Sequence, residues 1–118
     1  METRFRLRLY FGDRLTFGPG KADLLTQIDA LGSIAAAGRA MGMSYKRAWS
    51  LVEDMNGGFM AALVVSTRGG PAGGGARLTE AGRAVLDHYR RLEAIVEREG
   101  AVEIAAIEAG LRDMSGGK

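Results

Sequence analysis

Residues 32–56, GSIAAAGRAMGMSYKRAWSLVEDMN, contain the signals for two helices and a tight turn between them. Ser33 is a good N-terminal cap for a short helix over residues 34–41, because its hydroxyl can accept a hydrogen bond from a free N–H of the first turn. The glycine that follows can end this helix. Two residues later Ser44 can cap a second helix, which we expect to run to about Asn56. Two short helices joined by a glycine-containing turn predict a helix-turn-helix.

The second helix of this pair divides into an apolar and a polar side. Gly38 and the alanines of the first helix leave room for another helix to approach closely. Residues at helical spacing form its inward stripe, namely Ala48, Leu51, Val52 and Met55. Polar and aromatic side chains are left near its start, namely Ser44, Tyr45, Lys46, Arg47, Trp49 and Ser50.

These polar and aromatic side chains are the candidate functional residues. The second helix of a helix-turn-helix enters the major groove of DNA with its N-terminal residues at the base edges. Lys46 and Arg47 could pair with guanine there, and serine hydroxyls suit several bases. The alternative is structural, with Tyr45 and Trp49 packed between helices and the cations on a solvated face. We expect the packing role for Trp49 and the DNA role for Lys46 and Arg47.

A strand pair is expected after the two helices. Leu63-Val64-Val65 is typical of a strand, the loop from Arg68 to Ala76 is rich in glycine, and Arg77-Leu78 can return as a second strand. In this position the pair would be a wing, whose flanking arginines can lie along DNA phosphates. The alternative is a surface loop without a function. A nucleotide-binding P-loop is excluded, because no Gly-Lys-Ser/Thr leads from these glycines into a helix.

A long amphipathic helix follows the wing. Thr79 can cap it, and Glu80 is favourable in its positive first turn. Apolar residues recur every three or four positions on both sides of Gly100, the expected break, namely Val85, Tyr89, Leu92, Val96, Ile104, Ile107, Leu111 and Met114. One small domain has too little surface to cover both stripes, which predicts a homodimer through this helix. Residues 115–118 are expected to form a frayed tail.

A hairpin and one further helix are expected before residue 32. Apolar residues and arginines alternate over Arg4–Phe11, which is typical of a half-buried strand with its arginines in water. Gly12-Asp13 suits a tight turn into a second strand, Arg14–Phe17. Pro19 is tolerated in the first turn of a helix. The apolar stripe of that helix and the glycine that can end it are Leu24, Leu25, Ile28, Leu31 and Gly32.

The composition is that of one ordinary globular domain. The chain has 118 residues, of which 47% are hydrophobic and 25% charged. It has no cysteine, which excludes disulfides, thiolate metal sites and cysteine nucleophiles. Residues 1–78 carry ten Lys/Arg and six Asp/Glu (+4), whereas residues 79–118 carry six and eight (−2). A basic first part suits a module that meets a polyanion on one side.

The sequence offers no constellation for catalysis or metal binding. His88 is the single histidine and lacks a partner, so we expect a solvated helix residue. The carboxylates of Glu93, Glu97, Glu99 and Glu103 are expected on a solvated helix face. No apolar run approaches the ~20 residues of a membrane span. We therefore expect a cytoplasmic protein that is not an enzyme and that uses no cofactor, metal or membrane.

These segments resemble a known family. Residues 32–34 and 42–49, with Glu53-Asp54-Met55-Asn56, are similar to the DNA-binding domain of molybdate-responsive regulators of the ModE type. The segment 69–82 is similar to that family's wing and the start of its linker helix. The resemblance extends from the N-terminal strand to about Glu99, and Ser-Tyr-Lys-x-Ala-Trp is its specific part. The general frame is shared more loosely with LysR-type regulators.

The resemblance implies a winged helix-turn-helix that dimerises and binds operators of molybdate uptake or molybdoenzyme genes. It implies that residues 44–49 lie in the recognition helix and that the wing runs from Arg68 to Arg77. Two-domain members hold molybdate in β-barrel domains after the linker helix, whereas about twenty residues follow that point here. We therefore expect no molybdate binding by this chain itself, and a separate ligand-sensing protein is a candidate partner.

The sequence thus predicts an α+β, mainly helical fold, a winged helix-turn-helix with an N-terminal β-hairpin and a long C-terminal dimerisation helix. Residues 1–118 would form one domain, with the winged helix-turn-helix in 1–78 and the dimerisation helix and tail in 79–118. The expected function is sequence-specific DNA binding by a homodimeric transcriptional regulator at a palindromic operator. The alternatives are a winged-helix protein–protein adaptor and a LysR-like DNA-binding domain without an effector domain. The DNA-binding residues would be Ser44, Tyr45, Lys46, Arg47, Trp49, Ser50, Arg68 and Arg77.

Overall fold

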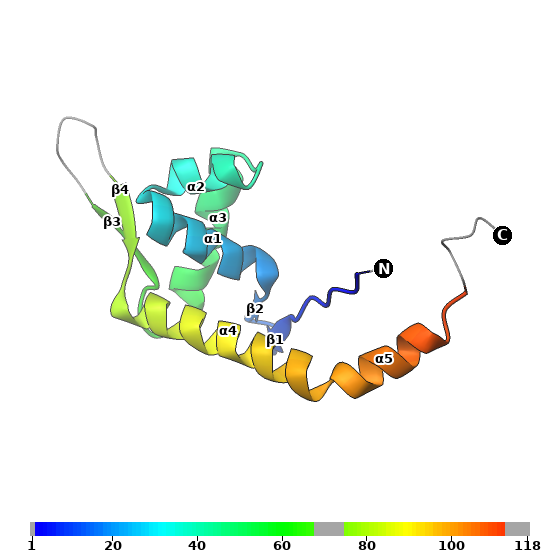
Figure 1. Cartoon of the computed structure of the whole chain (residues 1–118). Helices are drawn as coiled ribbons and strands as arrows, with labels where there is room; N and C mark the ends of the chain where they lie inside the picture. Colours follow the sequence, from blue (N-terminus) through cyan, green and yellow to red (C-terminus); the bar gives the residue numbers. More distant parts are fainter. Residues whose placement is uncertain (1, 68–74, 113–118) are drawn as a thin grey trace.

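Three helices form the centre of the molecule (Figure 1). The computed structural model describes residues 2–67 and 75–112. The central helices are α1 (Pro19–Leu31), α2 (Ile34–Ala40) and α3 (Tyr45–Gly58). The Ser33 hydroxyl accepts a hydrogen bond from the Ala36 N–H at 3.0 Å. The Ser44 hydroxyl accepts one from the Arg47 N–H, also at 3.0 Å. The predicted helix-turn-helix is confirmed, with α2 one residue shorter and α3 two residues longer than expected.

Glycine at position 38 allows α2 and α3 to pack closely. A Cβ atom placed on Gly38 would lie 3.0 Å from the Cβ of Ala48, which is tighter than ordinary side-chain contact. The turn between the helices contains Gly42 with a φ of +71°, a conformation that glycine adopts without steric cost. The predicted close approach of the two helices is therefore confirmed.

The N-terminal hairpin is shorter than the sequence suggests. Strands β1 (Leu9–Phe11) and β2 (Leu15–Phe17) pair antiparallel, with Leu9 opposite Phe17. The prediction of a strand was wrong for residues 4–8. Because α1 begins at Pro19, directly after β2, no residues remain to pair with that segment. Its alternation is still present, since Phe5 and Leu7 are partly buried while the arginines between them are exposed.

The second hairpin is the predicted wing. Strands β3 (Val64–Thr67) and β4 (Gly75–Leu78) pair antiparallel, with Val64 opposite Leu78. The side chain of Asn56 in α3 holds the start of β3, accepting hydrogen bonds from the N–H groups of Leu63 and Val64 and donating one to the Val64 carbonyl. On the other strand, the Ala76 N–H donates to the Gly32 carbonyl at 2.9 Å. The wing is therefore tied to both α3 and the end of α1.

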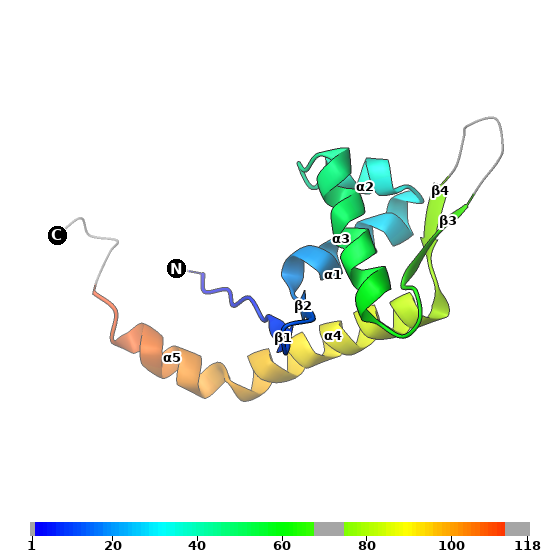
Figure 2. The same cartoon turned by 180° about the vertical axis from the view of Figure 1, so that it is seen from behind.

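Helix α4 (Glu80–Glu99) crosses the base of this body, and α5 (Ala101–Ala109) continues beyond it (Figures 1 and 2). Thr79 caps α4 as predicted, accepting from the Gly82 N–H at 2.9 Å. A Cβ at Gly82 would lie 2.1 Å from the Leu63 carbonyl oxygen, so no other residue fits there without a backbone shift. Gly100 separates the two helices at the predicted break.

The apolar stripe predicted for α4 was only partly correct. Leu86, which the stripe omitted, and Tyr89 are its buried apolar side chains, whereas Val85 and Leu92 are half-buried. The close contact at Gly82 turns the side of α4 that carries Leu86 toward the core. Beyond this contact region Val96 is exposed, and α5 contains no buried residue. Met114 and residues 115–118 lie outside the described residues.

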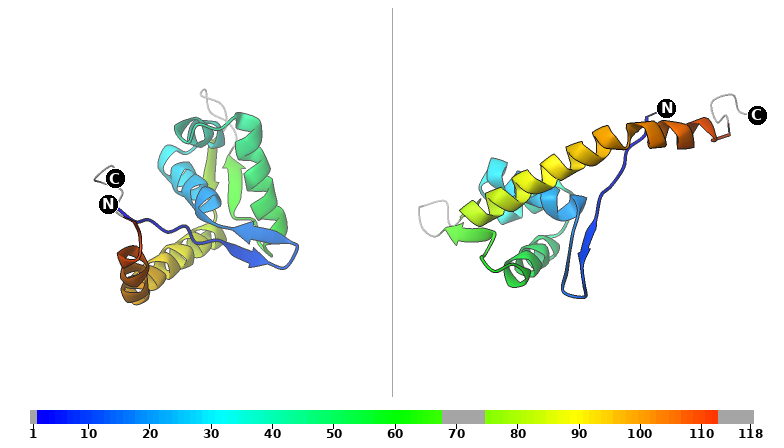
Figure 3. Two further views of the ribbon diagram at one scale, coloured as in Figure 1. Left: turned by 90° about the vertical axis from the view of Figure 1, so that its right-hand side faces the viewer. Right: turned by 90° about the horizontal axis from the view of Figure 1, so that it is seen from below.

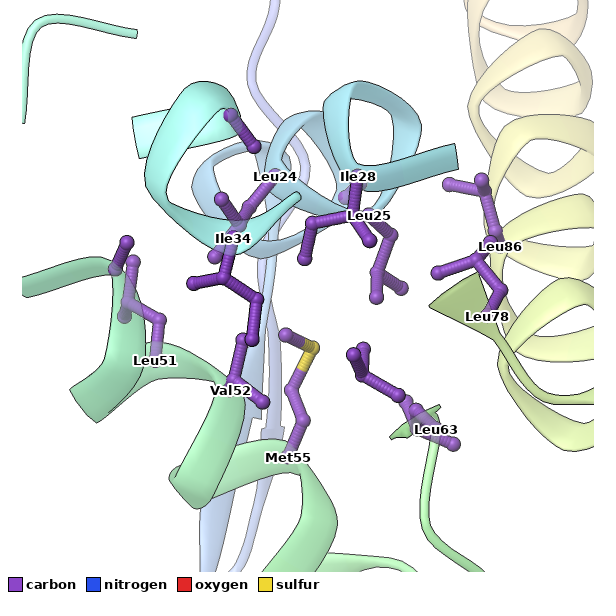
Figure 4. Close-up of a cluster of buried hydrophobic side chains, with 14 of the residues drawn as sticks. Leu24, Leu25, Ile28, Ile34, Leu51, Val52, Met55, Leu63, Leu78 and Leu86 are labelled. Carbon is purple, nitrogen blue, oxygen red and sulfur yellow. The ribbon is translucent and has the colours of Figure 1, made fainter. Parts of the chain in front are cut away.

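The core lies between α1, α2, α3 and the wing and is closed on one side by α4, seen at the right of Figure 4. The inward stripe predicted for α3 is confirmed, since all four of its residues are buried. Met55 is fully buried and extends from α3 into the cluster. Leu31 was expected in the core but is 48% exposed, because it lies in the last turn of α1 at the edge of the packed region.

The architecture is an α+β, mainly helical winged helix-turn-helix, as predicted. Ion pairs join α4 to α1, between Arg83 and Asp29 at 2.8 Å and between Arg90 and Asp23 at 2.9 Å. The Tyr89 hydroxyl donates to the Leu7 carbonyl at 2.6 Å and so fixes the N-terminal segment on α4. Across residues 2–67 and 75–112, each helix is too short or too polar to span a bilayer.

Candidate nucleic-acid interface

Helix α3 presents three different strips around its buried side. Successive helical residues advance by about 100°, so the strip opposite the buried stripe consists of Lys46, Ser50, Glu53 and Gly57, all exposed. We call this the outward strip. One flank of it faces the wing and contains Tyr45, Trp49 and Asn56. The other flank faces the N-terminal hairpin and contains Arg47 and Asp54.

The wing-facing flank combines packing with exposure. Trp49 is half-buried and packs against the core, in agreement with the role expected for it. Tyr45 is 58% exposed, and its ring meets that of Trp49 edge-on at a centroid distance of 6.1 Å. Both rings line a groove of about 250 Å³ between α3, the start of α2 and the wing. The tryptophan therefore holds the tyrosine at the edge of this groove.

The hairpin-facing flank lies beside a buried lysine that the sequence did not reveal. Lys21 of α1 is only 9% exposed, and its ammonium group donates to the Thr16 carbonyl at 2.7 Å. Burial lowers the pKa of Lys21; the neighbouring charge of Asp54 opposes this, while those of Arg47 and Arg8 add to it. Lys21 lies outside the helix-turn-helix, so its position in the sequence gave no signal that it sits beside α3.

Arg77 of the wing does not lie with the side chains of α3. Arg77 is exposed, and its neighbours Ala76 and Leu78 are buried. Because side chains alternate across a strand, Arg77 points to the face of the hairpin away from the helices. Arg68 lies outside the described residues.

The charges of α3 are ordered along its length. Lys46 and Arg47 lie in the first turn, where the free N–H groups give the helix end a partial positive charge. Glu53 and Asp54 lie two turns later. The first turn of α3 and the end of the wing where β3 finishes both point away from α4, and the wing lies to one side of the central helices (Figures 1 and 2). In the view from that edge-on direction its strands are seen in the gap between α1 and α3 (Figure 3, left). The positive end of α3 and the wing therefore share one end of the molecule.

Comparisons with known proteins identify relatives of these segments. No protein-family profile matches the chain. The molybdenum-pterin-binding protein MopB of Rhodobacter capsulatus is 44% identical over 81 residues, 69% of this chain and 30% of its own. The transcriptional regulator ModE of Yersinia pestis is 37% identical over 98 residues, 83% of this chain and 37% of its own. The DNA-binding transcriptional dual regulator ModE of Escherichia coli K12 is 34% identical over the same lengths. The chain is a homologue of the ModE-type regulators.

The ModE-type match covers most of this chain but a smaller part of its relatives. The chain spans about a third of the length of the curated proteins it matches. Among solved structures, full-length CbnR in complex with its target DNA aligns with a TM-score of 0.56 and 22% identity, covering 74% of this chain and 28% of CbnR. This structural likeness supports the winged-helix fold.

Two other hollows of this ModE-type homologue differ in chemistry from the groove beside Trp49. One, of about 510 Å³, lies between the β1–β2 turn and the second half of α3 and is of mixed charge, lined by Asp13, Glu53 and Asp54 and by Arg14 and Lys21. The other, of about 190 Å³, is wholly apolar and lies between the N-terminal hairpin and α4, next to His88. Within the described residues, no three histidine, aspartate or glutamate side chains gather as metal ligands.

Proposed function

We propose that this chain is the DNA-binding domain of a transcriptional regulator and that α3 reads the major groove. The observation that carries this proposal is the exposed, positively charged first turn of α3, which shares one end of the molecule with the wing. Lys46 and Ser50 on the outward strip would reach base edges, and Arg47 would reach them from the flank. The regulator names of the homologues support the same function.

The wing would hold the DNA without reading its sequence. Arg77 on the outer face of β4, and Arg68, would contact phosphates by charge. Removal of such a cation weakens binding to every sequence alike and lowers the salt dependence by about one charge. We therefore assign base recognition to α3 and phosphate contacts to the arginines of the wing.

We further propose that the chain binds a palindromic operator as a homodimer formed through α4 and α5. All nine residues of α5 are at least partly exposed, and Ile107 is 70% exposed. The apolar hollow beside α4 extends this uncovered surface toward the N-terminal hairpin. A two-fold dimer would set two α3 helices roughly 34 Å apart, or a multiple of this, and so require symmetric half-sites. Residues 1–118 would then act as one unit, with DNA binding in 1–78 and dimerisation in 79–118.

The target genes are proposed from the relatives. The names of four homologues describe ModE regulators, and others describe molybdenum transport or molybdenum-pterin binding. We propose that the operators belong to molybdate transport or molybdoenzyme genes, and that a separate protein supplies ligand sensing where such sensing occurs.

Selection of bound sequences from random double-stranded DNA tests this function directly. We expect a two-fold symmetric consensus and an affinity that falls steeply with salt concentration. Sedimentation at micromolar concentration should show a dimer, and the complex should contain two chains per site. Recovery of no enriched sequence, with binding that does not depend on salt, would favour the adaptor function instead.

A further inference from the structure

The groove between α3 and the wing is lined by uncharged hydrogen-bonding groups. The hydroxyl-bearing residues Ser33, Tyr45, Ser66 and Thr67 line it, together with Trp49. Among the residues that the structure describes, those lining the groove include no carboxylate and no cation. The Ser33 oxygen accepts the capping hydrogen bond of α2, and Thr67 accepts one from the Gly75 N–H at 3.1 Å. An accepting hydroxyl still has its own proton to donate, so the groove offers donors to an acceptor-rich ligand.

Ser66 faces the helices rather than the outer side of the wing. It pairs across the hairpin with Ala76, and directly opposite residues of an antiparallel pair lie on the same face. Ala76 is buried against the body, whereas Ser66 is exposed. The inner face of β3 therefore begins at buried Val64 and ends at Ser66, which reaches past the packed region into the groove.

We propose that this groove holds the sugar–phosphate strand that separates the major groove read by α3 from the minor groove next to it, with Ser66 donating a hydrogen bond to one phosphate. The inference rests on the proposed function. A winged helix that has one element in the major groove and another beside it must let one DNA strand pass between them. Hydroxyl groups are common phosphate donors, and the absence of carboxylates from the lining leaves nothing there to repel the strand. The hydrogen bond from Ser66 would fix the position of the protein along the DNA without adding a charge to the interface.

A free oxyanion is not expected to occupy the groove. Hydroxyl donors alone, at an open surface, compete poorly with water for a small dianion. A DNA strand is different, because contacts on both sides of the groove already hold it in place. Titration with inorganic phosphate alone should therefore show no binding and no competition with DNA at millimolar concentration. Stoichiometric phosphate binding that Ser66→Ala abolishes would identify a free-anion site and overturn the proposal.

The test uses the full chain and the DNA recovered by selection. Ser66→Ala should weaken binding roughly three- to tenfold, the loss of one hydrogen bond, and leave the salt dependence unchanged. Ser66→Asp should weaken it about tenfold or more at low salt, and less at high salt, because the added charge repels the strand. Thr3→Ala and Met60→Asp are matched controls on exposed residues outside the groove and should bind as the wild type does.

Neutral phosphate analogues locate the contact on the DNA. Single methylphosphonates placed along one strand should reveal a position per half-site at which the wild type loses affinity and Ser66→Ala loses less. If DNA is bound but Ser66→Ala and Ser66→Asp both match the wild type, the groove assignment is wrong while the proposed function stands. If no DNA sequence is bound at all, both are wrong.

Discussion

Helices α3 and α5 both carry apolar residues at helical spacing, yet their surroundings are opposite. The four stripe residues of α3 are buried, whereas none of the residues of α5 is. Elements from both sides of α3 cover it: α2, the wing and the N-terminal hairpin. Only α4 and the N-terminal segment lie near α5 among the parts of the chain that the structure describes. An apolar stripe in the sequence thus indicates which residues share one face of a helix. Whether that face is buried depends on which other elements pack against it.

The largest expected difference between the two helices is in stability. Met55→Ala should lower the free energy of unfolding by about 2–5 kcal/mol, because it leaves a cavity in a fully packed core. Ile107→Ala in α5 should change it by less than about 0.5 kcal/mol in dilute solution, where the chains are separate. Urea denaturation measures both. Equal losses would mean that α5 is covered within its own chain, and the contrast between the helices would fail.

The next effect concerns binding. Arg47→Ala should cost about 1–3 kcal/mol of specific DNA binding and relax the preference at one position of each half-site. Arg77→Ala should weaken all sequences alike and lower the salt slope by about one unit. Both residues are exposed, so neither change should alter the unfolding transition. Fluorescence anisotropy at several salt concentrations separates the two. If Arg47→Ala weakened binding to all sequences equally, Arg47 would be a phosphate contact and not a base contact.

A smaller effect distinguishes the anchored α4 from α5. The hydrogen bond from Arg83 holds the pKa of the Asp29 carboxyl below its ordinary value of 3.8. A lowered folded-state pKa stabilises the protein above the ordinary value, and this contribution is lost as the pH falls through the folded-state value. Asp29→Asn should therefore be slightly less stable at pH 7, and the difference should shrink as the pH falls below the ordinary value of 3.8. Thermal melts against pH, with Glu97→Gln as the charge-matched control, check this. A constant difference down to about pH 2 would rule out the ion pair as its cause.

No effect at all is expected from molybdate. The hollow beside the β1–β2 turn is lined by three carboxylates and two cations, Arg14 and Lys21, so its charges do not favour an oxyanion, and the hollow beside α4 is apolar. The glycine-rich segment whose backbone could cradle an anion, residues 69–75, lies outside the described residues except for Gly75. Calorimetric titration of this chain with molybdate and tungstate should give no heat of binding. A stoichiometric site with a Kd near a micromolar would require donors from a second chain at the dimer interface.

Sequence signals were sufficient to predict the helix starts, because these are set by contacts between residues close together in the chain. Ser33, Ser44 and Thr79 cap helices within three residues of themselves, so their roles could be read without knowing the fold. Leu31 and Leu86 were misassigned because burial depends on which distant element lies above them. Lys21 was missed for the same reason, since α1 and α3 become neighbours only through folding. The face of the wing on which Arg77 lies could not be predicted either, because β4 begins at Gly75, two residues before the expected start, and its buried neighbours Ala76 and Leu78 are known only from the fold.

The three hydrogen bonds of Asn56 offer a way to change the DNA-binding geometry of such a protein by one substitution. One amide group joins the last turns of α3 to the first residues of β3, so it sets the angle at which the wing leaves the body. The substitution Asn56→Asp would replace the donor facing the Val64 carbonyl with a second acceptor and tilt the hairpin. Every exposed cation would remain in place while the spacing between helix and wing changed. A substitution at position 56 can therefore change the spacing between α3 and the wing, and with it the DNA geometry that fits best, while every DNA-facing side chain is kept.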